Sequence, residues 1–126
     1  MAYRVSKAQF GELVEAALDE LPEEFANFLE EVPIEVRDQP TQAQLQSAGV
    51  APGGLLLGLY VGRPRTKRNV EDSGAMPDMI YIFQDPIQTV CNSEMQLIRQ
   101  VRVTVLHEIG HHFGLSEADL ERFGYR

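Results

Sequence analysis

TVLHEIGHHFG, residues 104–114, contains the pattern His-Glu-x-x-His-x-x-Gly. On a helix, His107 and His111 are four residues apart, so both imidazoles project from one face, one turn apart. Two imidazoles at that spacing can hold one Zn²⁺, and Glu108 can take a proton from a water bound to the metal. The alternative interpretation is a pair of surface histidines on a solvated helix. All three histidines of the chain lie between positions 107 and 112, and this clustering favours the metal site.

The motif lies in a long helix predicted over residues 94–113. Gly110 is the only glycine in this stretch, which has no proline, and Asn92 or Ser93 can cap its start. Its apolar residues spread over much of the circumference, which is typical of a buried helix. Gly114 provides the C-terminal stop, and a last short helix is predicted from residue 116 to residue 123.

The pattern leaves the third metal ligand to be found. A catalytic zinc normally has three protein ligands and one water. No histidine follows the motif, so the third ligand must be a carboxylate, Cys91 or a group from a second chain. Glu117 extends the pattern to HExxHxxGxxE, an offset that the chain reaches when the glycine turns it back beneath the metal. Asp119 and Glu121 are competing carboxylates, and the helix dipole alone also favours an acidic residue at 117.

Two further residues of metal-binding type are not interpreted as ligands, and His112 either supports a ligand or has a structural part. His112 points about 100° away from His111 on the helix, so it is a poor third ligand. Cys91 has no nearby histidine and no CxxC partner, which favours a small buried core residue over a thiolate ligand or a nucleophile.

Apolar periodicity predicts the elements that precede the motif. Ser6 and Gln9 match a capping box at the start of a first helix, and Pro22 suits the first turn of a second. Alternating or apolar runs between turn residues predict strands at residues 34–38, 55–61 and 79–83. A short helical turn is predicted at 41–48, and a short helical or irregular piece is predicted at 87–91. Residues 63–74 are predicted to be a solvated loop, with a basic arm for a substrate carboxylate as the functional alternative. Helices and strands without regular alternation indicate an α+β fold with a small mixed sheet.

Composition limits the class of protein. The 126 residues suit one domain spanning residues 1–126, and 44% hydrophobic residues are too many for a disordered chain. A net charge of −8 makes nucleic acid an unfavourable partner. Neither a signal-peptide core nor a membrane-spanning stretch is evident, and one cysteine forms no intrachain disulfide. These features predict a cytoplasmic protein without a membrane partner.

Residues 104–114 closely resemble the signature of the small bacterial zincin-like metallopeptidases, sometimes described as minimal metalloproteases. LPEEF at residues 21–25, the stretch 32–38, LLGLY at 56–60 and Pro77-Asp78 before Ile80-Tyr81 also resemble that family, so the similarity covers nearly the whole chain. It implies a compact single-domain zincin-like fold with the HExxH helix at its centre. It also implies one zinc, held by the two histidines and an acidic third ligand. An aspartate often occupies the position of Glu117 in that family, and glutamate is one methylene longer.

Together, the motif and the resemblance predict a zinc metallopeptidase that hydrolyses a peptide or protein substrate. Glu108 would act as general base on the water and then carry the proton to the leaving amine. We expect the strand at residues 79–83 to be an edge strand beside the site, where an extended peptide can add by main-chain hydrogen bonds. The alternative function is a non-catalytic zinc-binding regulatory or interaction module with four protein ligands. A third is a metal-dependent amidase or hydrolase for a small molecule.

Overall fold

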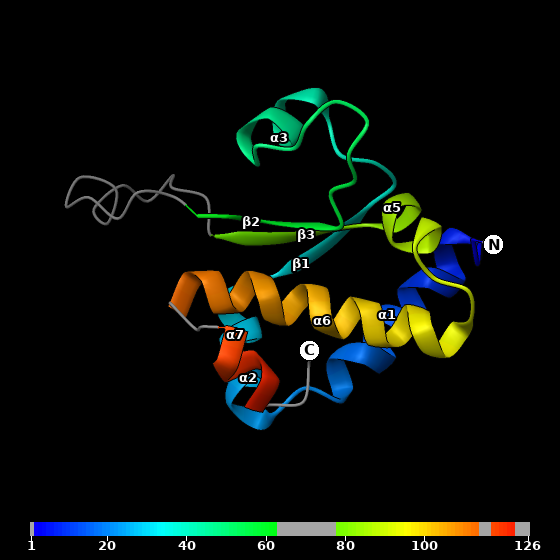
Figure 1. Cartoon of the computed structure of the whole chain (residues 1–126). Helices are drawn as coiled ribbons and strands as arrows, with labels where there is room; N and C mark the ends of the chain where they lie inside the picture. The colour runs from blue at the N-terminus through cyan, green and yellow to red at the C-terminus, as the bar shows by residue number, and fades with distance from the viewer. Residues whose placement is uncertain (1, 63–77, 114–116, 123–126) are drawn as a thin grey trace.

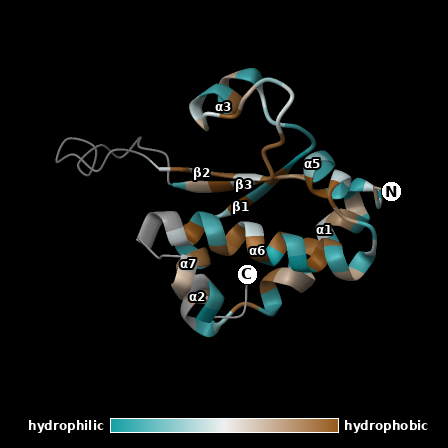
Figure 2. Cartoon of the chain, in the orientation of Figure 1, coloured by the Kyte–Doolittle hydropathy of each residue, from teal (hydrophilic) through white to brown (hydrophobic). Residues whose placement is uncertain are grey.

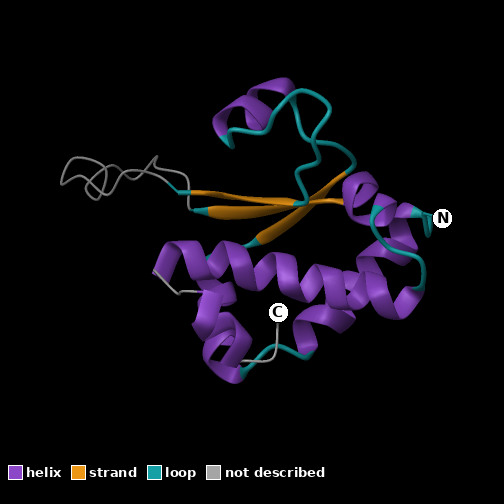
Figure 3. Cartoon of the chain, in the orientation of Figure 1, coloured by secondary structure: helices purple, strands orange, loops and turns teal. Residues whose placement is uncertain are grey.

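A computed structural model of the chain describes residues 2–62, 78–113 and 117–122, with the backbone alone at residues 24, 111–113, 117, 119 and 120. Figures 1 and 3 show the arrangement of its helices and strands. In chain order the elements are α1 (Lys7–Asp19), α2 (Glu23–Glu31), β1 (Ile34–Arg37), α3 (Gln42–Ser47), β2 (Gly58–Val61), β3 (Met79–Phe83), α5 (Gln84–Thr89), α6 (Glu94–Phe113) and α7 (Glu117–Arg122). The predicted α+β class is confirmed.

The three strands form one mixed sheet in the order β1-β3-β2. β1 runs parallel to β3, with Ile34 opposite Ile80, and β2 runs antiparallel to β3, with Leu59 opposite Tyr81. The expectation that residues 79–83 form an edge strand is wrong, because β3 is central and β2 is an edge of the described sheet. The sequence of β3 is Met-Ile-Tyr-Ile-Phe, and Ile80, Ile82 and Phe83 are buried.

Helix α6 lies against one face of this sheet, with α1 beside it, whereas α3 lies on the opposite side (Figure 1). Figure 2 shows that hydrophobic residues follow the strands and recur along α6. One core joins α1, the sheet and α6, and its fully buried residues include Phe10, Ile80, Ile82, Leu97, Val101, Val105, Leu106 and Ile109. The predicted burial of the motif helix is therefore confirmed, and this core fixes α6 relative to the sheet.

A capping residue starts the long helix α6, and an ion pair ties it to α1. Ser93 Oγ accepts a hydrogen bond from the Gln96 N–H at 3.2 Å, so Ser93 caps the start of α6. An ion pair between Arg102 and Glu20 ties the middle of α6 to the end of α1. No helix within the described ranges is both long and apolar enough to cross a membrane.

Local details differ from the sequence predictions in three places. The helical or irregular piece expected at 87–91 is the helix α5, which begins at Gln84. Pro86 fits there because first-turn N–H groups have no partner within the helix. β2 begins at Gly58 and is shorter than the predicted 55–61. Ser6 Oγ accepts from the Gln9 N–H as predicted, but the reciprocal capping box forms at the start of α3. The loop predicted at 63–74 lies outside the described residues.

Candidate functional site

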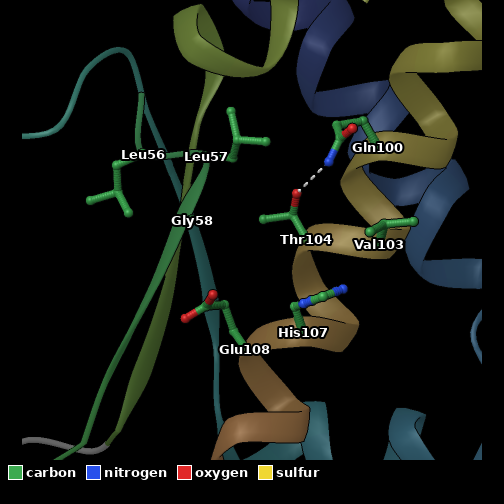
Figure 4. Close-up of a pocket in the computed structure, with 8 residues that line it drawn as sticks. All are labelled: Leu56, Leu57, Gly58, Gln100, Val103, Thr104, His107 and Glu108. Carbon is green, nitrogen blue, oxygen red and sulfur yellow. Dashed lines mark hydrogen bonds between the residues drawn. The ribbon is translucent and has the colours of Figure 1, made fainter. Parts of the chain in front are cut away.

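His107 and Glu108 are neighbours in the C-terminal half of α6, and both are half-buried. They line a cavity of about 290 Å³ between α6 and the segment that leads into β2. Figure 4 shows the Glu108 carboxylate pointing toward β2 and the His107 ring pointing away from it. Successive helical residues differ by about 100° in direction, so the two side chains diverge as expected.

The rest of the cavity wall is largely apolar. Leu56, Leu57 and Val103 supply hydrophobic surface on its two sides. Within the wall, Gln100 Nε2 donates to Thr104 Oγ1 at 3.2 Å, so the Thr104 hydroxyl has a partner (Figure 4). The site therefore joins an imidazole and a carboxylate to a hydrophobic cleft of side-chain size.

Glu108 is bound to the backbone of the edge strand. The N–H of Tyr60 donates to Glu108 Oε1 at 2.9 Å. Directly before the same strand, the Leu57 carbonyl accepts from the Phe83 N–H at 3.0 Å, which makes that pair a hydrogen-bonded one. Pairs alternate along an antiparallel ladder, so the N–H of Tyr60 points away from β3. The carboxylate thus lies at the outer edge of the sheet, where a further strand can add.

Gly58 allows the strand to approach the helix this closely. A Cβ atom at Gly58 would lie 2.5 Å from Thr104 Cγ2 and 3.1 Å from the Tyr81 carbonyl oxygen. Both distances are shorter than ordinary van der Waals contact between such atoms. A larger residue would therefore push β2 away from α6.

A second hydrogen bond anchors Tyr60. Its hydroxyl donates to Asp78 Oδ2 at 2.7 Å, and Asp78 is buried directly before β3. The side chain of Tyr60 is thereby tied to the start of the central strand while its backbone contacts α6. This double attachment fixes the edge of the sheet at the point where it meets Glu108.

The remaining predicted site residues fall largely outside the described part of the structure. This holds for Gly114 and for the side chains of His111, His112, Glu117 and Asp119. The backbone places residue 111 on α6, one turn after His107, and α7 begins at residue 117 and packs against α6. Glu121 is exposed on α7.

The backbone places two of the predicted donors, at positions 107 and 111, one turn apart on one helix, as a zinc site requires. Among the side chains that the structure describes, no three His, Cys, Asp or Glu residues form a metal-binding group. However, α6 continues without interruption to Phe113, so positions 107 and 111 share a face of one helix.

Cys91 is 2% exposed, belongs to the hydrophobic core and precedes the first turn of α6. This burial confirms the interpretation of Cys91 as a core residue.

The sequence model of the family described as zincin-like metallopeptidase matches residues 29–125. The chain belongs to the zincin-like metallopeptidase family. The match includes the sheet, α6 and α7, so the resemblance inferred from the motif is confirmed over most of the chain. Members of this zincin-like family are generally hydrolases and typically bind zinc.

A solved structure supports the zincin-like chain's fold. The conserved hypothetical protein TTHA0227 from Thermo thermophilus is similar with a TM-score of 0.60 and 22% sequence identity, over 86% of this chain and 94% of that protein. At this identity the similarity shows the fold alone. No curated protein matches the sequence.

Sequence reasoning on this zincin-like chain missed the three residues that connect Glu108 to the sheet. Tyr60 contributes a backbone N–H, which any residue except proline would supply, so no motif reveals it. Thr104 precedes the motif by one helical turn and resembles a core residue. Gly58 did carry a signal, because an isolated glycine inside a strand often marks a close approach of another element.

Proposed function

We propose that this chain is a zinc-dependent peptidase in which Glu108 is the general base. The observation that carries this proposal is the position of the Glu108 carboxylate. It lines the same cleft as His107 and accepts a hydrogen bond from the outward edge of β2. A carboxylate at that place shares a cleft with an imidazole that would bind the metal, and it contacts the backbone beside which a peptide would dock.

The residues that would hold the metal are His107, His111 and Glu117. Two imidazoles one turn apart and a carboxylate after the helix end are a ligand set that zinc accepts. When bound, zinc would acidify a water molecule and polarise the carbonyl group of the substrate.

Glu108 would move the proton. Its carboxylate would accept a proton from the water that attacks the peptide carbonyl, and would then deliver that proton to the leaving nitrogen. The peptide C–N bond breaks, and the products are a carboxylate and an amine. Among the described residues, Glu108 Oε1 is held by Tyr60 and Oε2 makes no hydrogen bond, so Oε2 is the oxygen that would contact the water.

The substrate would be an extended peptide added to β2. The N–H and C=O of Gly58 and the C=O of Tyr60 point away from β3, and such groups bind an added strand by hydrogen bonds, whereas the Tyr60 N–H already holds Glu108. The apolar wall formed by Leu56, Leu57 and Val103 would accept a hydrophobic side chain of that peptide.

A cleavage assay tests this function. The zinc-loaded wild-type protein is incubated with a library of short peptides, and cleavage is followed by mass spectrometry with zinc content measured in parallel. Glu108→Gln should keep about one zinc per chain and lose cleavage by about 10²–10⁴-fold. Glu94→Gln removes an exposed carboxylate from the first turn of the same helix and should leave cleavage intact. Equal cleavage by Glu108→Gln and wild type would contradict the assigned role.

A further inference from the structure

We propose that the edge strand β2 positions the general base. The main-chain N–H of Tyr60 holds one oxygen of Glu108, and Gly58 is the positioning residue that brings this N–H within reach. The proposal rests on the proposed function and adds a role for two residues outside the His-Glu-x-x-His motif.

The hydrogen bond orders the half-buried side chain of Glu108. A glutamate has three rotatable side-chain bonds, and ordering it costs conformational entropy. Tyr60 donates to Oε1 at 2.9 Å from a backbone group that is itself fixed in the sheet. The N–H therefore selects one direction for the carboxylate before substrate arrives, and this direction leaves Oε2 available.

The strand is anchored at two positions, Gly58 and Tyr60. Two residues before Tyr60, Gly58 rests against Thr104 with no room for a Cβ atom. At Tyr60 itself, the side-chain hydroxyl bonds Asp78 Oδ2 at 2.7 Å. A strand moved outward at Gly58 would carry the Tyr60 N–H away from Glu108, because the backbone between them spans two residues.

Thr104 lies one helical turn before Glu108, on the same face of α6. The contact between Gly58 and Thr104 thus sets the distance between β2 and α6 at the level of the carboxylate. The atom closest to a Cβ placed at Gly58 is the Thr104 methyl carbon. The Thr104 hydroxyl accepts a hydrogen bond from Gln100 instead. Serine at 104 would keep the hydroxyl and remove the methyl, which gives a direct way to relieve a Cβ atom placed at 58.

The kinetic test is a double-mutant cycle on the zinc-loaded protein. Gly58→Ala should lower kcat by about 10–100-fold, with a smaller change in KM and unchanged zinc content, since misplacement by about 1 Å can cost 100-fold. Thr104→Ser, measured alone as the reference, should restore at least several-fold of the lost kcat when combined with Gly58→Ala. Gly11→Ala on α1, where a Cβ meets no atom within 4 Å, is the matched control and should keep the wild-type kcat.

The second test does not depend on activity. The hydrogen exchange rate of the Tyr60 amide, followed by NMR, should rise at least about 10-fold in Glu108→Ala relative to wild type, because the acceptor is lost. The same exchange rate in both proteins would overturn the contact, and an unchanged kcat in Gly58→Ala would overturn the positioning role. If the wild type cleaves no peptide, the proposed function fails, and the amide measurement still decides whether Tyr60 holds Glu108.

Discussion

The Tyr60 hydroxyl donates to Asp78 Oδ2 at 2.7 Å, and Asp78 is 3% exposed. Tyr60→Phe would leave a buried carboxyl group with one donor fewer, which typically costs about 1–3 kcal/mol of unfolding free energy. Urea denaturation measures this loss. Tyr81→Phe is the matched control, because the Tyr81 ring stacks on Phe83 and its hydroxyl makes no hydrogen bond among the described residues. Equal stability of the two variants would contradict the importance of the Tyr60 bond.

Because α6 packs in the core along one side, substitutions at two neighbouring positions of this helix should differ in their effect on the free energy of unfolding. Leu97 is 0% exposed and packs in the core, whereas Met95, two residues away, is 82% exposed. Leu97→Ala should lower the unfolding free energy by about 2–5 kcal/mol through lost burial and a cavity. Met95→Ala should change it by less than about 0.5 kcal/mol. Thermal or chemical denaturation followed by circular dichroism gives both values, and similar losses would show that α6 packs differently.

Burial raises the pKa of the Cys91 thiol, and this predicts a dependence of stability on alkaline pH. The folded state favours the protonated thiol, so the unfolded chain ionises first, above about pH 8.5. The contribution of Cys91 is therefore complete below that pH and is lost as the pH rises toward the pKa of the folded state. Between about pH 8 and about pH 10, the wild type should lose more unfolding free energy than Cys91→Ala. Parallel slopes for the two proteins would contradict this.

Removal of the metal should destabilise the protein if α6 holds zinc. A ligand at 100 times its dissociation constant adds about 2.7 kcal/mol to the stability of the folded state. Adding a chelator should therefore lower the melting temperature of the wild type and leave that of His107→Ala almost unchanged. Differential scanning calorimetry with and without chelator makes the comparison. A chelator effect of the same size in His107→Ala would place the metal elsewhere.

Local patterns predicted much of the fold. The strands at 34–37 and 79–83 and the helices around the motif follow from apolar periodicity and from capping residues such as Ser6 and Ser93, which act within a few positions of the chain. The α+β class follows from their order. The strand order did not follow, because pairing joins residues far apart in sequence, and β3 is central where an edge strand was expected.

Only the part of the candidate site that depends on local spacing was predicted from the sequence. A helix of 3.6 residues per turn relates His107, Glu108 and His111 through spacing alone. The contact between Glu108 and Tyr60 joins residues 48 positions apart, through a backbone group that has no sequence signature. Gly58 was visible as a glycine within an apolar run, but its partner Thr104 was identified only by the three-dimensional structure.

The most direct test of the proposed zinc site is a crystal structure of the zinc-loaded protein, with the metal located by its anomalous scattering. We predict one zinc, bound by the imidazole nitrogens of His107 and His111 and by a carboxylate oxygen of Glu117, with distances of about 2.0–2.2 Å. A fourth position should be open to solvent beside Glu108. A fourth protein ligand that closes this position, or a zinc bound away from α6, would contradict the assignment of this chain as a peptidase.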